Sequence, residues 1–192
     1  MTRGCVLLSC MLLLLAGCAD SPESRFFVLS PVPPSQPAAA VDGDPLVVDA
    51  VDIPESLDRP ELVRRLNDYR MDVSDVDRWG APLGRMIREV FIEDLAERLP
   101  RGMVVVDGRP GDRGPARAVV INIHDFAGWP GGEVKLDVSW AVLDGLQGDP
   151  VVRRRQTIQV PTGGTQSINQ ADGMSRALGT LADIIVSALA RA

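Results

Sequence analysis

Residues 134–142 read Val-Lys-Leu-Asp-Val-Ser-Trp-Ala-Val, which places an apolar side chain at every second position. Successive side chains of a β-strand point to opposite faces, so this alternation predicts a strand with one apolar face. The opposite face carries lysine, aspartate, serine and alanine, and we expect it to be solvated or used for binding. The apolar face needs a covering layer, and its members are Val134, Leu136, Val138, Trp140 and Val142.

Two amphipathic helices are expected to supply that layer. Apolar residues recur every four positions between Pro82 and Leu99, which is typical of one helical face. Pro82 suits the first turn of this helix, and Pro100 ends it. The C-terminal stretch from Met174 to Leu189 shows the same periodicity.

Several shorter β-branched or apolar runs predict further strands. A tight turn at Asn67-Asp68 joins two of them, and the Gly-Trp-Pro-Gly-Gly stretch at 128–132 joins two others. Strands, helix, strands and helix in this order predict an α+β fold, with two amphipathic helices packed on a mostly antiparallel β-sheet. The additional strands are expected at residues 46–53, 61–66, 69–73, 103–106, 118–126 and 151–160.

The charge balance of the chain is acidic. Its 192 residues include 20 Lys and Arg against 26 Asp and Glu, for a net charge of −6. This balance argues against nucleic acid as a partner, because contacts to phosphates need a basic face. The length suits a single domain, which we place at residues 46–192.

The first 18 residues, MTRGCVLLSCMLLLLAGC, have the organisation of an export signal. Arg3 is followed by an apolar run of 11 residues, too short for a bilayer span of about 20 residues. The next residues, Leu-Ala-Gly-Cys at 15–18, resemble the lipobox of bacterial lipoproteins. The resemblance implies a signal peptide at residues 1–17 and lipidation of Cys18 by a diacylglycerol and an N-acyl chain. We expect no other cofactor.

Two alternatives to this interpretation remain. The segment could be an ordinary signal peptide that happens to end at a cysteine, and Leu-Leu-Ser-Cys at 7–10 is a second lipobox with a shorter apolar run. Cleavage before Cys18 would remove Cys5 and Cys10, and residues 19–192 contain no thiol. Ala19 after the cysteine favours the outer membrane by the sorting rule of enteric bacteria, while Asp20 leaves the inner membrane open in other lineages.

Residues 18–45 are expected to form the lipidated cysteine and a Pro-rich tether. Six prolines make the segment from residue 19 too extended and polar to pack, with a reach on the order of 75 Å for some 25 residues. The run Arg-Phe-Phe-Val-Leu at 25–29 is the exception, and it predicts a short edge strand docked on the domain.

The chain offers few groups for catalysis. His124 is the single histidine, and its neighbour Asp125 would point to the opposite face of the predicted strand. We therefore expect a histidine without a catalytic partner, no metal site and no enzyme, since zinc needs several His or Cys ligands. The basic run at 153–155 favours a solvated edge strand over contact with an acidic partner or lipid headgroups.

The densest group of unusual residues lies between Pro54 and Leu83. Asp58 precedes a turn set by Pro60, and Trp79 stands directly before the helix, where it could fix the entry angle of the chain. We treat the group as a partner-binding or structural motif. Its members are Leu57, Asp58, Arg59, Pro60, Asn67, Arg78, Trp79 and Pro82.

These residues resemble the motif of the ABC-type transport auxiliary lipoprotein family. The matching pattern is a strand ending Ile-Pro, then Leu-Asp-Arg-Pro, Leu-Val-x-Arg, Asn, and Arg-Trp-x-x-Pro-Leu at the start of a helix. Gly80-Ala81 departs from the small-plus-acidic pair expected there. The resemblance implies a non-enzymatic lipoprotein on the periplasmic face of the outer membrane. Its partner would be an MCE-domain protein that bridges the periplasm in an intermembrane lipid-transport system, and the resemblance leaves a homo-oligomer open.

Other functions remain as alternatives. A periplasmic lipid-binding carrier would hold its cargo in a groove between helix and sheet. An assembly lipoprotein would instead bind an outer-membrane protein, and an envelope hydrolase would need a nucleophile and a base that the sequence does not show.

Overall fold

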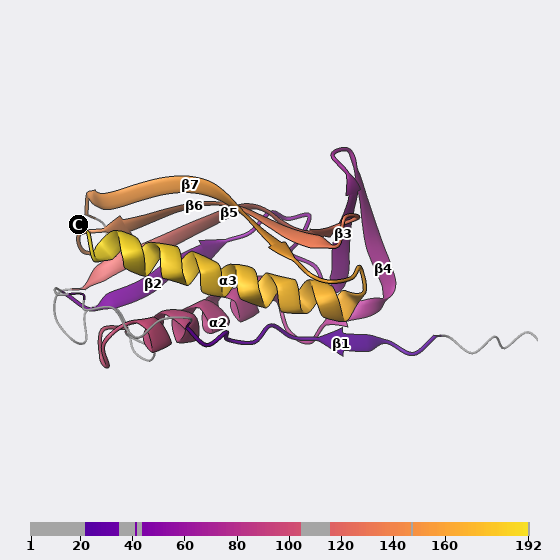
Figure 1. Cartoon of the computed structure of the whole chain (residues 1–192), viewed down its shortest axis with the longest axis horizontal. Coiled ribbons are helices and arrows are strands. Elements are labelled where there is room, and N and C mark those ends of the chain that lie inside the picture. Colours follow the sequence, from indigo (N-terminus) through magenta and orange to yellow (C-terminus); the bar gives the residue numbers. More distant parts are fainter. Residues whose placement is uncertain (1–21, 35–40, 42–43, 105–115, 147, 192) are drawn as a thin grey trace, which may run out of the picture.

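A seven-stranded mixed β-sheet carries two helices on one face (Figure 1). The computed structural model describes residues 22–34, 41, 44–104, 116–146 and 148–191. The elements are β1 (Arg25–Phe27), β2 (Leu46–Asp52), β3 (Glu61–Asn67), β4 (Arg70–Trp79), α2 (Leu83–Arg98), β5 (Arg117–Trp129), β6 (Glu133–Leu143), β7 (Pro150–Pro161) and α3 (Ser167–Leu189).

The strands lie in the order β1-β4-β3-β5-β6-β7, and β2 also pairs with β5. The long central pairs β5/β6 and β6/β7 are antiparallel, as is the β3/β4 hairpin. Three other pairs, β1/β4, β2/β5 and β3/β5, are parallel, because long connections rather than hairpins join their members. The α+β fold with two packed helices is therefore confirmed, and its sheet is mixed.

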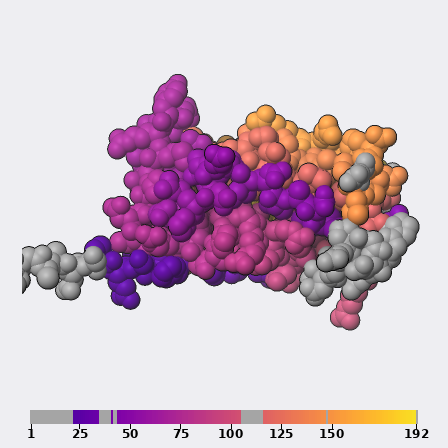
Figure 2. All heavy atoms as spheres, turned by 180° about the vertical axis from the view of Figure 1, so that it is seen from behind, coloured from indigo at the N-terminus to yellow at the C-terminus, as the bar shows by residue number. Residues whose placement is uncertain are grey.

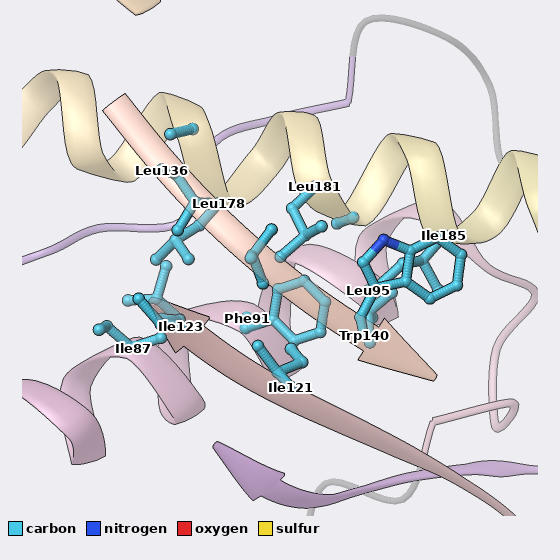
Figure 3. Packing of buried hydrophobic residues seen from close by; sticks show 14 of the residues in the cluster. Ile87, Phe91, Leu95, Ile121, Ile123, Leu136, Trp140, Leu178, Leu181 and Ile185 are labelled. Atoms are coloured by element: carbon cyan, nitrogen blue, oxygen red, sulfur yellow. The ribbon is translucent and has the colours of Figure 1, made fainter. Parts of the chain in front are cut away.

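Strand β6 has the two faces that its sequence predicts. Leu136 and Trp140 are fully buried and point toward α2 and α3, whereas Lys135 and Asp137 on the other face are partly exposed (Figure 3). The layer above them consists of helical side chains with the predicted spacing. Figure 3 labels Ile87, Phe91 and Leu95 of α2 with Leu178, Leu181 and Ile185 of α3.

Helix α3 begins seven residues before the predicted start at residue 174. The additional turns were not visible in the apolar periodicity because their buried residues are polar or small: Ser167, Gln170, Ala171 and Gly173. A Cβ at Gly173 would lie 2.5 Å from the Cγ2 atom of Thr162, so this glycine allows the helix to approach β7 closely. Helix α2 runs from Leu83 to Arg98, as predicted.

The predicted turns also hold. The β3/β4 turn falls at residues 68–69, and the β5/β6 turn contains Gly132 at a φ of +72°, a conformation that favours glycine. Strand β4 extends beyond the predicted end at residue 73, since its second half pairs with β1. Of the strand predicted at 103–106, Val104 makes an isolated bridge to Leu46, and residues 105–106 lie outside the described residues.

Within the described ranges, every helix is too short or too polar to cross a membrane.

Replacing Phe91 tests whether the contact between α2 and the sheet is the core of the domain. The ring is fully buried near Ile121 and Leu181 (Figure 3). We expect Phe91→Ala to lower the free energy of unfolding by about 3–5 kcal/mol, measured by urea denaturation. Val151→Ala on the edge strand β7 is the control and should change it by less than about 0.5 kcal/mol. Equal losses in the two variants would contradict this assignment of the core.

Candidate functional site

Five of the predicted motif residues surround one open hollow, which we call the motif hollow. It has a volume of about 340 Å³ and lies where the turn before β3, the end of β4 and the start of α2 meet. Trp79 is buried beside it, whereas Asp58 and Arg59 are exposed. Its lining consists of Asp58, Arg59, Pro60, Trp79, Ala81 and Pro82.

Backbone hydrogen bonds hold the two halves of the motif together. The N–H groups of Leu57 and Asp58 both donate to the carbonyl of Pro54, at 2.8 and 3.1 Å, which closes the turn before β3. The N–H of Trp79 donates to the carbonyl of Pro60 at 2.7 Å. Residues separated by about twenty positions in the chain therefore meet at one place, with the Leu57 side chain buried beneath them.

An ion-pair cluster lies beside the motif hollow. Arg59 Nε donates to Glu61 Oε2 at 3.1 Å, and Arg78 Nη1 donates to Glu61 Oε1 at 3.3 Å. The hydrogen bond from Arg59 holds the pKa of Glu61 below its ordinary value, with smaller contributions from the charges of both arginines. The side chains of Arg59 and Arg78 are 43% and 35% exposed, so a partner can reach them.

One predicted motif residue lies elsewhere. Asn67 ends β3 at the tip of the hairpin, where its Oδ1 accepts a hydrogen bond from the N–H of Tyr69 at 2.9 Å. This contact shapes the turn, as asparagine commonly does. Asn67 is therefore a turn residue, and it is not part of the motif hollow.

A second group of polar residues, which sequence reasoning missed, joins the first turn of α3 to β1, β3 and β4. Buried Asp77 accepts hydrogen bonds from Arg25 Nε at 2.6 Å and from the Ser167 hydroxyl, and Arg64 donates to the same hydroxyl. Burial alone would raise the pKa of Asp77, but the hydrogen bonds from Ser167 and Arg25 outweigh it and lower the pKa. No local signal marked Asp77, because its partners are 52 and 90 positions away.

Two hollows of about 320 and 430 Å³ flank Arg64 in this region. The first lies between the base of the β3/β4 hairpin, the β5/β6 turn and the start of α3, and it includes Trp129 and Gln170. The second lies beside β1 and includes Arg25 and Ile168. A Cβ at Gly128 would lie 3.0 Å from Gln170 Oε1, so glycine lets this side chain reach the carbonyl of Val63.

Comparison with known families matches residues 27–186 to the ABC-type transport auxiliary lipoprotein component. The chain belongs to this family. The matched range contains every residue of the motif hollow, all of α2 and α3 as far as residue 186, so the resemblance inferred from the motif is confirmed.

Two solved structures share the fold of this auxiliary lipoprotein. An uncharacterised protein superposes with a TM-score of 0.70 at 16% identity, covering 87% of this chain and 99% of the other. A protein from Xanthomonas campestris superposes with a TM-score of 0.68 at 14% identity, covering 85% of this chain and 93% of the other. The search of curated proteins found no match.

Residues 25–34 of the auxiliary lipoprotein, which we call the strap, are fixed across both helices. The Ser30 N–H donates to Ser175 Oγ at 3.1 Å, and the Val32 N–H donates to Asp94 Oδ1 at 2.8 Å. Arg98 Nη1 donates to the carbonyl of Val32 at 3.0 Å. Strand β1 confirms the predicted docked edge strand, and Ser30 and Val32 of the predicted tether dock as well. Residues 18–21, 35–40 and 42–43 of that tether lie outside the described residues.

Polar side chains on the helices make this docking possible. Asp94 and Arg98 are both buried and form an ion pair at 3.3 Å, and Arg98 Nε also donates to Asp183 Oδ1 at 2.7 Å. A Cβ at Gly179 would lie 3.2 Å from the Cβ of Val32, so glycine leaves room for the strap. The Pro-rich, polar composition of the tether predicted none of this, because the contacts use backbone groups of the strap.

Burial raises the pKa of Asp94 to about 6. The Val32 N–H and the Arg98 guanidinium favour the carboxylate, but they do not offset the loss of hydration. Among the described residues, Asp94 Oδ2 has no hydrogen-bond partner, which agrees with a carboxylate that is costly to ionise.

His124 and the basic run of β7 lie on exposed parts of the sheet. His124 Nε2 lies 2.8 Å from Ser139 Oγ of β6, a contact that sequence reasoning missed, while Asp125 faces away and pairs with Arg65. Neither His124 nor Ser139 lines the three hollows described above. The described ranges also hold no cluster of three potential metal ligands. Strand β7 is an edge strand, as predicted, and its Arg155 pairs with Asp137 at 2.8 Å.

Asp94 should make the stability of the auxiliary lipoprotein depend on pH. Its pKa in the folded state exceeds the ordinary value of 3.8, so its contribution is complete below about pH 4 and is lost as the pH rises through 6. Between about pH 4.5 and pH 7.5 we expect the wild-type protein to lose about 2 kcal/mol of unfolding free energy relative to Asp94→Asn. Urea denaturation at the two pH values measures this difference.

Asparagine is a matched replacement because its Oδ1 can still accept the hydrogen bond from Val32. The other carboxyl groups with shifted pKa values, Glu61, Asp77 and Asp137, have pKa values below their ordinary ones, so their stabilisation is lost only at more acidic pH. Parallel pH profiles for the wild-type protein and Asp94→Asn would contradict the raised pKa.

Proposed function

We propose that this auxiliary lipoprotein is a non-enzymatic docking subunit of an intermembrane lipid-transport system. Cys18 anchors it by acyl chains to the periplasmic face of the outer membrane. The motif hollow binds an MCE-domain protein that bridges the periplasm. Membership of the transport auxiliary family supports the general role, and the geometry of the motif supports the docking.

The observation that carries the docking role is the motif hollow itself. A buried tryptophan beside an open concavity, with arginines at the rim, has the composition that dominates binding energy in protein interfaces. Arg59 and Arg78 share a single carboxylate partner, Glu61, so part of their hydrogen-bonding capacity is left for a partner. The exposed Asp58 on the lining balances the charge of the cluster, and the guanidinium donors suit an acidic or carbonyl-rich segment of the partner.

The strap supports the anchoring role. Arg25, where the strap begins, lies seven positions after Cys18. At about 3.6 Å per extended residue, this link spans at most about 25 Å, compared with about 75 Å for an undocked tether. A strap fixed to the helices therefore holds the domain close to the membrane that carries the acyl chains.

The packing between the helices and the sheet supports the docking subunit over a lipid carrier. Phe91, Leu136, Trp140 and Leu178 fill this space and are fully buried. The three hollows lie instead at the ends of strands and helices, and charged residues line part of each. A bound acyl chain would have to displace the core that holds the domain together.

Replacing Cys18 tests the anchor, which lies outside the described residues. We expect Cys18→Ala to abolish incorporation of labelled palmitate in cells, because the thiol accepts the diacylglycerol. Cys10→Ala is the matched control, since it removes the second lipobox and should leave labelling unchanged. Labelling that persists in Cys18→Ala would exclude lipidation at this position.

Filling the motif hollow tests the docking. A photo-crosslinking residue at position 59 should capture the MCE-domain protein in cells, identified by mass spectrometry, whereas the same residue at 153 on β7 should not. Ala81→Trp should reduce this capture by at least about tenfold, since interface hot spots lie in well-packed pockets.

Two further variants control for misfolding. Val151→Trp places the same side chain on the distant edge strand and should leave capture unchanged. Arg59→Glu, read out by co-purification, should weaken binding without adding bulk. Binding of the MCE-domain protein by Ala81→Trp at the wild-type level would exclude the motif hollow as its site.

A further inference from the structure

The large exposed apolar side chains of the described residues gather at one end of the molecule. Six of the seven belong to β1 and the residue after it, to the β3/β4 hairpin, or to the first turn of α3. Figure 1 shows these three elements together at one end, and Figure 2 shows the hairpin above β1 from behind. The seven are Phe26, Val28, Leu66, Tyr69, Val73, Ile168 and, apart from the rest on β7, Val151.

The exposure of these side chains is large. Phe26 is 67% exposed, Val28 61%, Ile168 60% and Tyr69 97%. Arg25, Phe27 and Ile168 line the hollow beside α3, whereas the alternation of β1 directs Phe26 and Val28 away from it, so the exposed apolar side chains lie on both sides of β1. Single exposed apolar residues are common, but several at one end of a monomer indicate an interaction surface.

The length of the link between Cys18 and Arg25 indicates what this surface contacts. The strap is fixed to the helices and to β4 from Arg25 onward, and the Gly80 N–H donates to the carbonyl of Phe27 at 2.8 Å. An acylated Cys18, seven residues earlier, cannot lie more than about 25 Å from Arg25. The end that carries β1 is therefore the end nearest the membrane.

We propose that this membrane-facing end, defined by Phe26, Val28, Tyr69 and Ile168, inserts into the headgroup region of the bilayer that holds Cys18. The inference rests on the proposed acylation of Cys18. Aromatic and aliphatic side chains favour the boundary between headgroups and acyl chains. Arg70 of the hairpin is exposed and suits lipid phosphates, and the Arg25 guanidinium keeps donors that its bond to Asp77 does not use.

The acyl anchor makes a few such side chains sufficient. It converts their contact with lipid into an intramolecular event at high effective concentration, so no strong independent affinity is needed. Insertion at three elements would fix the orientation of the domain as well as its distance from the membrane. An anchor with a flexible link would fix the distance alone.

The chain itself allows a direct test. Residues 19–192 contain no cysteine, so one introduced thiol can be labelled selectively in the full, acylated chain. We would label Phe26→Cys, Ile168→Cys and the control Val151→Cys with an environment-sensitive fluorophore. Each protein is then reconstituted in phosphatidylethanolamine and phosphatidylglycerol vesicles that contain doxyl-labelled lipid. Mass spectrometry of each preparation reports the acyl chains on Cys18.

We expect quenching by the doxyl lipid at positions 26 and 168 to exceed that at position 151 by about threefold or more. Equal quenching at the three positions in an acylated chain would overturn the membrane-facing end and leave the anchor intact. A blue shift without doxyl quenching would overturn it in favour of contact between copies of the chain. A Cys18 without acyl mass would overturn the anchor and this inference together.

Discussion

Burial of the apolar face of β6 under the two helices is the constraint on which the rest of the structure depends. Leu136 and Trp140 are removed from water only if α2 and α3 lie side by side across the strand. That arrangement brings the start of α3 to the β3/β4 hairpin and the start of α2 to the end of β4. The motif hollow and the polar group around Asp77 thus form where the covering helices begin.

A buried ion pair within α2, which also reaches α3 through Asp183, organises the contact with the strap. Asp94 and Arg98 lose hydration on burial, and such pairs contribute little net stability unless hydrogen bonds satisfy both partners. Here the backbone of Val32 supplies part of what is missing, because its N–H and carbonyl bond to Asp94 and Arg98 respectively. The strap therefore completes a polar site that the helices leave open, which explains how its Pro-rich second half, residues 30–34, can dock.

Periodicity predicted the elements that bury apolar side chains, and it failed where polar or small residues form the contact. Alternation located β6, and the four-residue spacing located α2 between its two prolines. Apolar periodicity did not predict the first turns of α3, because the residues that bury there, Ser167 and Gln170, are polar and form hydrogen bonds. The motif could be recognised from residues 57–60 and 78–82, but the meeting of its two halves depends on the long-range bond between Trp79 and Pro60.

The Pro-rich N-terminal segment of this auxiliary lipoprotein has a different consequence when part of it is docked as the strap. A flexible tether would let the domain reach far into the periplasm but would leave its orientation free. Docking of residues 25–34 replaces that reach by a limited distance between the proposed anchor at Cys18 and the helices. In the proposed assembly the partner spans the periplasm and supplies the reach. What such a partner needs at the membrane is an oriented binding surface, which the proposed short link and apolar end would provide.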